Sequence, residues 1–163
     1  MAQEARGLAQ RFAHRLREAL QEAMRREGAV GALGVCQEQA PLIAEEIAQA
    51  SGWQVGRTAL RLRNQANGPD AWEAAGLREF QARAAAGQPV AGMFRAEVVE
   101  GAKGRNFRYL EAIPAGGACL ACHGSRLAPE VRARIDELYP GDQATGFQEG
   151  DLRGAFSLSR RLP

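Results

Sequence analysis

The chain has 163 residues, a length that suits one domain with a core of its own. Its hydrophobic share of 45% and charged share of 25% are ordinary for a globular domain and exclude wholesale disorder. The net charge is only +2 and the arginines are scattered among acidic residues, so no nucleic acid is expected as a partner. No apolar run reaches the roughly 18 residues that a membrane-spanning helix needs.

An amphipathic helix is predicted at the N-terminus, over residues 4–27. Its apolar residues recur every fourth position among Arg, Glu and Gln, which is the spacing of one helical face. This face consists of Leu8, Phe12, Leu16, Leu20 and Met24. Gly28 and Gly31 are expected to end the helix. The same stripe would suit a core or the pairing of two copies, so a homodimer is one expected arrangement.

A second helix is predicted from Gly34 to Ser51, with Cys36 on its interior stripe and Gly52 as its stop signal. Strand-like segments follow at residues 53–63, 89–99, 106–113 and 152–159. A hairpin turn at 101–104 is expected to join the second strand to the third.

Two more helices are predicted at 70–86 and 129–138, the second with a proline in its first turn. This order of elements predicts an α+β fold with an antiparallel sheet and long N-terminal helices, for which a PAS-like core is the natural candidate. We expect one domain over residues 1–163, with an N-terminal helix in 1–30 and the core in 31–163.

The most specific feature is the segment Cys119-Leu120-Ala121-Cys122-His123. Two thiols at this spacing can form thioethers with the two vinyl groups of haem, and the neighbouring imidazole can bind the iron. Chance would produce this pattern about once in a thousand sequences with the same cysteine and histidine content. The motif predicts one covalently attached c-type haem, with His123 as the proximal ligand.

Three other interpretations of these residues stay open. Cys119 and Cys122 could be a catalytic dithiol, although such a pair usually opens a helix after a βα unit and here glycines flank it. Zinc could bind both of them with Cys36 and a histidine, but the second ligand pair typical of such sites is missing. A disulfide between Cys119 and Cys122 would leave His123 without a role.

The residues alone leave Cys36 open as either an inert buried thiol or a second axial ligand. As a thiolate it would donate electrons strongly and lower the reduction potential of the iron, unlike a methionine thioether. Three residues are weaker candidates for the same position. His14 is expected to be solvated, and Met24 and Met93 are expected to pack in the core.

Haem carries two propionates, which arginine pairs well because its planar fork matches a carboxylate. Arg57, Arg61 and Arg63 recur at strand spacing, so they could project together toward propionates or form a solvated sheet face. Arg57 and Arg61 are therefore candidate cofactor-binding residues. The aromatic residues could wall a haem pocket or fill a core without contacting haem. They are Trp53, Trp72, Phe94, Phe107, Tyr109 and Phe156.

Several blocks of the sequence resemble the Tll0287-like family, the DUF3365 haem-binding domain. The matching blocks are residues 35–41, 52–58, 61–64, 69–73, 119–124, 129–131, 138–140, 144–147 and 150–157. The resemblance implies a PAS-like fold, one haem c, an extracytoplasmic location, and iron held by a histidine and a cysteine. It makes His123 the proximal ligand and Cys36 the distal one.

A c-type haem is attached outside the cytoplasm in bacteria, so a periplasmic or other extracytoplasmic location is expected. Met1–Gly7 lacks the apolar core of a signal peptide, and we expect an export signal or membrane anchor to have been removed. The resemblance implies a sensor of redox state or of a small ligand such as CO or NO, acting on a separate, unidentified redox or signalling partner. An electron-transfer cytochrome c is the alternative. An enzyme is not expected, because His14 is the only histidine besides His123.

Overall fold

The computed structural model describes residues 1–101 and 104–163. Four strands form one antiparallel sheet in the order β1-β4-β3-β2. They are β1 (Gln54–Thr58), β2 (Phe94–Gly101), β3 (Gly104–Pro114) and β4 (Leu152–Arg161).

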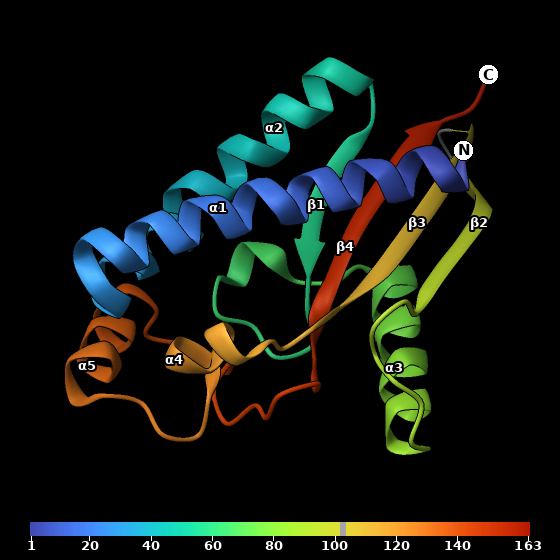
Figure 1. The fold of residues 1–163 in the computed structure, drawn as a ribbon. Helices are drawn as coiled ribbons and strands as arrows, with labels where there is room; N and C mark the ends of the chain where they lie inside the picture. Colours follow the sequence, from blue (N-terminus) through green and yellow to red (C-terminus); the bar gives the residue numbers. More distant parts are fainter. Residues whose placement is uncertain (102–103) are drawn as a thin grey trace.

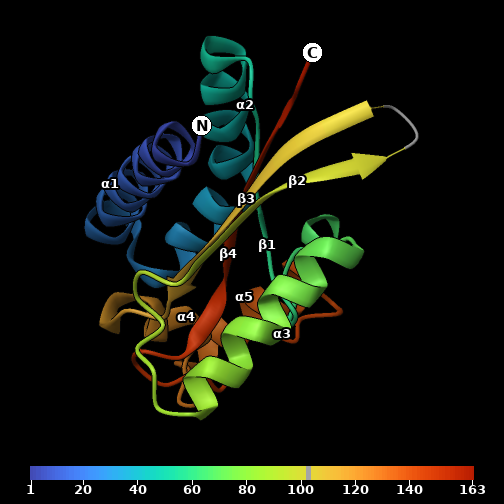
Figure 2. The ribbon, with the colours of Figure 1, turned by 90° about the vertical axis from the view of Figure 1, so that its right-hand side faces the viewer.

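Helices cover both faces of the sheet (Figures 1 and 2). α1 (Ala2–Gly34) and α2 (Ala40–Ser51) pack on one face, and α3 (Ala71–Ala85) packs on the other. The α+β fold with a PAS-like antiparallel sheet and long N-terminal helices is confirmed. No helix in 1–101 or 104–163 is both long and apolar enough to cross a membrane.

Gly28 interrupts the first helix, as predicted, but α1 is longer than predicted because a second helical segment follows the kink. Gly28 has φ +69° and ψ −168°, a conformation that is open almost only to glycine, and helical structure then continues to Gly34. Gly31 lies inside this continuation and does not break it. The chain therefore changes direction at Gly28 and resumes a helical conformation after it.

A π-helical turn, η1 (Val35–Gln39), joins α1 to α2. The predicted helix from Gly34 to Ser51 is thus two segments, and the wider turn takes Cys36 out of phase with the buried face of α2. Cys36 is half-buried, whereas the residues on that face are buried. Gly52 ends α2 with φ +71°, as its position predicted.

The main core lies between α1, α2 and the sheet. Leu8, Phe12 and Leu16 are buried in it, and the ring of Phe12 lies 5.5 Å from that of Phe156 on β4. The first three residues of the predicted stripe therefore pack inside the molecule, and Leu20 packs partly against them. Met24 departs from the prediction, because it is 38% exposed and lies outside this core.

β1 is shorter than the predicted strand and ends at Thr58, where it runs close to β4. A side chain on Gly154 would place a Cβ 2.6 Å from the carbonyl oxygen of Thr58, so the backbones approach closely there. The chain then leaves the sheet, and the carbonyl of Leu62 accepts a hydrogen bond from Gln143 N–H at 2.7 Å. Residues 59–63 are therefore not strand, contrary to prediction.

The other strands agree better with prediction. β2 begins at Phe94, so the predicted strand residues 89–93 precede it. Gly101 pairs with Gly104 across the hairpin, and the turn residues Ala102 and Lys103 lie outside the described residues.

Two predicted helices have nearly the predicted bounds. Asp70 caps α3 and exchanges hydrogen bonds with Glu73 in a capping box. α5 (Pro129–Leu138) matches its prediction in both bounds. Local capping and a proline at the first turn fix these ends, which is why the sequence predicted them well.

Candidate haem site

The Cys-x-x-Cys-His segment lies at one end of the sheet, below the bend in α1 (Figure 1). Cys119 ends a 3-10 turn, η3 (Gly117–Cys119), and the next residues form the single turn α4 (Leu120–His123). All three cysteines are free thiols, and each is half-buried. The structure therefore does not contain the disulfide considered from the sequence, and both thiols of the motif are free to form thioethers.

One ring nitrogen of His123 makes a hydrogen bond, and the other is available to bind a metal. Its Nδ1 lies 2.7 Å from the carbonyl oxygen of Ala144. A carbonyl can only accept, so Nδ1 carries the proton and Nε2 keeps its lone pair. Burial, followed by the charges of Arg153 and Arg63, lowers the pKa of His123 to about 3. The imidazole is therefore neutral near pH 7, which is the form and the tautomer that bind a metal through Nε2.

The backbone of His123 is held by the segment that follows α5. Its carbonyl accepts a hydrogen bond from Phe147 N–H at 2.9 Å, and the carbonyl of Gly124 accepts one from Gly146 N–H at 3.0 Å. The ring of Phe147 is edge-on to the imidazole, with centroids 6.2 Å apart. Phe147 was not among the aromatic residues predicted for the pocket.

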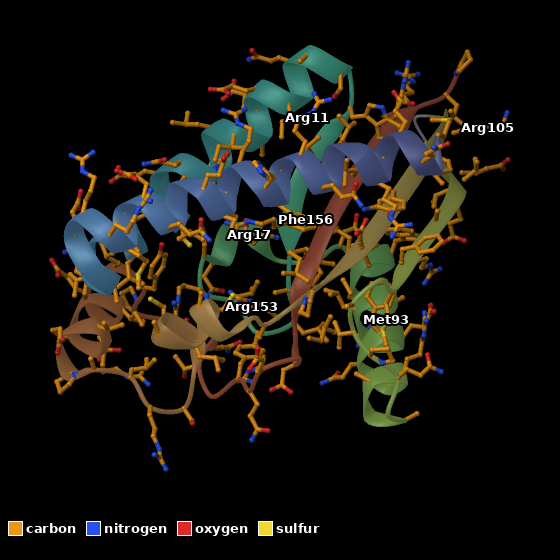
Figure 3. The ribbon with its side chains drawn as sticks, in the orientation of Figure 1. Arg11, Arg17, Met93, Arg105, Arg153 and Phe156 are labelled. Atoms are coloured by element: carbon orange, nitrogen blue, oxygen red, sulfur yellow. The ribbon has the colours of Figure 1, made fainter. Side chains whose placement is uncertain are left out.

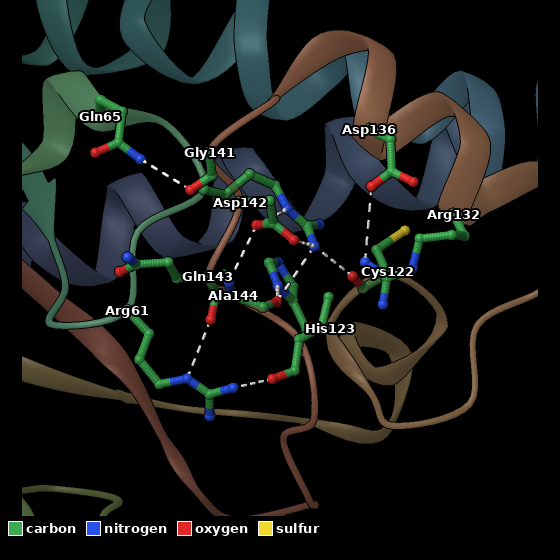
Figure 4. Close-up of polar contacts among 12 residues, drawn as sticks. Arg61, Gln65, Cys122, His123, Arg132, Asp136, Gly141, Asp142, Gln143 and Ala144 are labelled. Atoms are coloured by element: carbon green, nitrogen blue, oxygen red, sulfur yellow. Dashed lines mark hydrogen bonds and ion pairs between the residues drawn. The ribbon is translucent and has the colours of Figure 1, made fainter.

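A buried ion pair ties the two sides of this site together (Figure 4). Arg63 Nε lies 3.0 Å from Asp142 Oδ1, and both side chains are almost fully buried. Arg63 Nη2 also donates to the carbonyls of Cys122, at 2.6 Å, and Ala144, at 3.2 Å. Arg63 thus links the peptide before His123 to the carbonyl that orients its ring.

Asp142 completes this network by accepting a hydrogen bond from Ala144 N–H at 3.0 Å. Burial alone would raise the pKa of the Asp142 carboxyl. The hydrogen bonds from Arg63 and Ala144 outweigh burial and hold that pKa below its ordinary value. Asp142 therefore stays ionised and keeps the charge of Arg63 paired.

Cys36 reaches the same region from η1. Burial raises the pKa of the Cys122 thiol, the charge of Arg63 lowers it, and negative charge on Cys36 or Cys119 raises it, so Cys36 lies within electrostatic range of Cys122. No group of three Cys, His, Asp or Glu side chains in the described ranges converges as metal ligands, which is what a Cys₃His zinc site requires. Two axial donors, in contrast, are sufficient for haem iron.

The predicted common face of Arg57, Arg61 and Arg63 is wrong, because β1 ends at Thr58. Arg57 lies on β1 with its guanidinium 5.8 Å from the ring centroid of Phe12. Arg61 instead stacks on Phe147 at 4.3 Å and donates to the carbonyls of Gln143 and Thr145. A propionate contact by Arg57 or Arg61 stays a prediction.

Arg153, at the start of β4, was not predicted as a site residue (Figure 3). Burial and the neighbouring charges of Arg63 and Arg57 lower its pKa to about 10, while Cys36 and Asp142 act in the opposite direction. These neighbours place Arg153 in the same cluster as both predicted axial ligands. Its place in the matching block 150–157 was the signal that could have found it.

The remaining candidates lie away from the motif. His14 is exposed and pairs with Glu18 at 3.2 Å, as expected for a solvated residue. Met93 is buried in the core beneath α3, which agrees with the packing role expected for it. Four of the aromatic residues fill the core beneath α1, which supports the alternative that they pack without contacting haem. They are Trp53, Phe107, Tyr109 and Phe156. Trp72 packs on the α3 side, and Phe94 is 50% exposed.

The residues of the site fit a haem with two protein ligands. Two free thiols stand at the spacing that thioethers require, a neutral histidine keeps a lone pair on Nε2, and a third thiol lies within the same cluster. An α+β domain with this donor set is a haem-binding protein, and the comparisons with known proteins agree.

A model of the Tll0287-like family matches residues 1–160, and the chain belongs to this family. The structure is similar to the crystal structure of the cyanobacterial haem protein Tll0287, with a TM-score of 0.63 and 33% sequence identity. That match covers 79% of this chain and 73% of the other. No curated protein matches the sequence.

Proposed function

We propose that this haem-binding protein carries one haem c on Cys119 and Cys122, with His123 and Cys36 as the axial ligands. We further propose that it acts outside the cytoplasm as a sensor of redox state or of a small ligand. The observation that carries the proposal is the state of His123, whose Nδ1 proton is held by Ala144 and whose Nε2 is free. A histidine of purely structural role would not need this arrangement next to two free thiols.

The chain's own residues divide the work of holding the cofactor. Cys119 and Cys122 fix its edge, His123 is kept rigid by Arg63 and Asp142, and Cys36 approaches from a different segment. When bound, the haem supplies a one-electron redox centre that also accepts diatomic ligands.

Cys36 is the residue that suits a switch. It lies on the π-turn η1, between the bend at Gly28 and α2, whereas His123 is fixed by hydrogen bonds on both sides. π-Turns are rare and often mark functional sites. η1 would therefore have two arrangements, one with Cys36 bound and one with Cys36 released. An element with two such states is what a sensor needs.

The test compares absorption spectra of the exported protein, oxidised and reduced, with those of Cys36→Ala. We expect a low-spin c-type spectrum with a thiolate signature that the variant loses, and CO binding by the reduced wild type. His14→Gln is the control and should leave every spectrum unchanged. Matching spectra of the wild type and Cys36→Ala would overturn the ligand assignment, and a reduced protein that refuses CO would overturn the sensor role.

The second candidate is an electron-transfer cytochrome c. The buried Arg63–Asp142 pair favours it, because a rigid proximal ligand reduces the rearrangement that accompanies electron transfer. This role expects fast, reversible voltammetry without ligand change, whereas the sensor expects redox-linked spectral hysteresis. In either role we propose an unidentified redox or signalling partner and no enzymatic turnover, and reduction of peroxide by the purified protein would contradict this.

A further inference from the structure

A half-buried arginine at the site has no carboxylate partner among the residues that the structure describes. Arg153 makes one long hydrogen bond, from Nη1 to the carbonyl of Arg61 at 3.4 Å, and its guanidinium lies 5.5 Å from the ring centroid of Phe147. Both contacts are weak for a charged group that has lost much of its water. Something beyond these contacts is needed to stabilise the charge.

The charges around Arg153 make this imbalance larger. The protein groups whose charges act on it are Arg63, Arg57, Cys36 and Asp142. Asp142 is already held by Arg63 through two hydrogen bonds. With Arg153 itself, this set contains three guanidinium groups and one carboxylate, which is a surplus of two positive charges when Cys36 is neutral. A surplus of this kind in a half-buried cluster is typical of an anion-binding site.

Arg61 does not share this property, although the sequence ranked it with Arg57. Its Nε and Nη2 donate to the carbonyls of Gln143 and Thr145, and its guanidinium stacks on Phe147 at 4.3 Å. Two of its three nitrogen atoms therefore donate to the loop that supports His123, and these bonds hold the guanidinium against Phe147. Arg153 has the free fork, and Arg57 has its guanidinium over the Phe12 ring with no carboxylate partner among the described residues.

We propose that Arg153, assisted by Arg57, binds the two propionates of the haem, and that Arg61 does not. The inference rests on the proposed haem c and adds the residues that hold its acidic edge. Two propionates would match the surplus of two positive charges, and the planar fork of arginine binds a carboxylate through two parallel hydrogen bonds. The guanidinium of Arg153 lies 5.5 Å from the centroid of the Phe147 ring, and that ring lies edge-on to His123 with centroids 6.2 Å apart, so Arg153 is close to the proposed proximal ligand.

The rival explanation for the charge of Arg153 is a hydrogen bond from its guanidinium to the sulfur of Cys36. A Cys36 thiolate would also raise the pKa of Arg153 and so favour its charged form. The two contacts predict different spectra. A propionate contact affects the propionate bending band in the resonance Raman spectrum, whereas a sulfur contact affects the thiolate signature in the absorption spectrum.

The experiment uses the exported, haem-loaded full chain and the variants Arg153→Gln, Arg153→Lys, Arg61→Gln and Arg105→Gln. We expect Arg153→Gln to shift the propionate band and to lower the midpoint potential, because a positive charge near the added electron is lost. The thiolate signature should be unchanged. Arg61→Gln tests the second half of the inference, and its propionate band should equal that of the wild type. Arg105→Gln removes an exposed arginine near the start of β3 and is the matched control, so neither its band nor its midpoint potential should change.

Arg153→Lys keeps the charge and loses the fork, so its midpoint potential should stay near that of the wild type while the propionate band shifts. This milder variant carries the test if Arg153→Gln does not fold. A propionate band unchanged in the Arg153 variants would overturn the inference, as would loss of the thiolate signature with an unchanged band. A wild-type protein without haem would overturn the proposed function itself, which is a separate and recognisable result.

Discussion

Asp142 and Arg63 show at the scale of single residues how the site is kept in place. Their ion pair is buried on both sides, and its hydrogen bonds reach the peptide before His123 and the carbonyl that orients its ring. Replacing a buried pair by apolar groups can be neutral, but removing one partner leaves an unpaired buried charge. The pair is therefore most informative when only one member is changed.

We predict that Asp142→Asn lowers the free energy of unfolding by about 3–5 kcal/mol, because the charge of Arg63 stays buried without its partner. Urea unfolding followed by circular dichroism measures this loss. The control is Asp136→Asn, which removes the partner of Arg132 in an exposed pair and should cost less than about 1 kcal/mol. Equal effects of the two variants would show that the buried pair contributes no more to the free energy of unfolding than the exposed pair does.

The pH dependence of stability should follow from the same carboxyl group. The pKa of Asp142 in the folded protein lies below its ordinary value of 3.8. Its stabilising contribution is therefore present in full above pH 3.8 and is lost as the pH falls through the lower folded pKa. Unfolding curves between neutral pH and about pH 2 should show Asp142→Asn losing less stability than the wild type over this acid range. Parallel curves for the two proteins would contradict the assignment.

At the scale of elements, the bend in α1 is the feature that positions Cys36. Gly28 provides it through a backbone conformation that other residues avoid. Any change that straightens α1 would move η1 away from α4. A substitution at Gly28 tests the bend without changing either proposed axial ligand.

We expect Gly28→Ala to lower the free energy of unfolding by about 1–3 kcal/mol, since alanine is strained at this φ and ψ. Gly7→Ala is the matched control on the same helix, where φ is negative and a new Cβ meets no atom within 4 Å. That variant should gain about 0.5–1 kcal/mol from helix propensity. Thermal unfolding of both proteins checks the opposite signs, and a stabilised Gly28→Ala would show that the bend is not constrained.

The elements also show which parts of the fold a sequence can predict. α3 and α5 were predicted nearly to the residue because capping groups and a proline lie within the helices themselves. The end of β1 was missed because residues 59–63 are held by partners far away in the sequence, such as Gln143, which donates to the carbonyl of Leu62. Gly28 was correctly predicted to break the helix, whereas the helical segment that resumes after it was not predicted, because glycine gives the same local signal in both cases.

The residues of the site also divide into those that a local motif predicts and those that it does not. Cys119, Cys122 and His123 were predicted together because thioether attachment needs them within one short segment. Arg153 and Phe147 were not predicted as site residues. Each acquires its role only when residues 142–153 close against α4, which is a tertiary event without a local pattern.

At the scale of the whole molecule, the long first helix belongs to the core. Phe12 is 1% exposed and packs on Phe156, and the residues on either side of it along the stripe are also buried. The stripe that suggested pairing of two copies is therefore used within one chain. A homodimer stays a prediction that would need a different surface.

We predict that Phe12→Ala lowers the free energy of unfolding by about 3–5 kcal/mol, as expected for a buried phenylalanine. The loss should be the same when the protein is diluted, because no intermolecular contact is removed. Leu42→Ala is the control, since Leu42 is 57% exposed and should change stability by less than about 0.5 kcal/mol. A destabilisation by Phe12→Ala that grows with protein concentration would show that the stripe joins two chains.

The length of α1 has a mechanical consequence. From Ala2 to Glu27, the residue before the bend, the helix is about 39 Å long, at about 1.5 Å per residue. Its far end is anchored by Glu4, which accepts hydrogen bonds from Trp53 and from Arg160 near the end of β4. Both chain termini lie at that pole (Figure 1). A tilt of about 5° around the bend would therefore displace the far pole by about 3 Å, so α1 is a lever arm whose fulcrum adjoins Ala29, the residue whose carbonyl oxygen lies 3.9 Å from Cys122 Sγ.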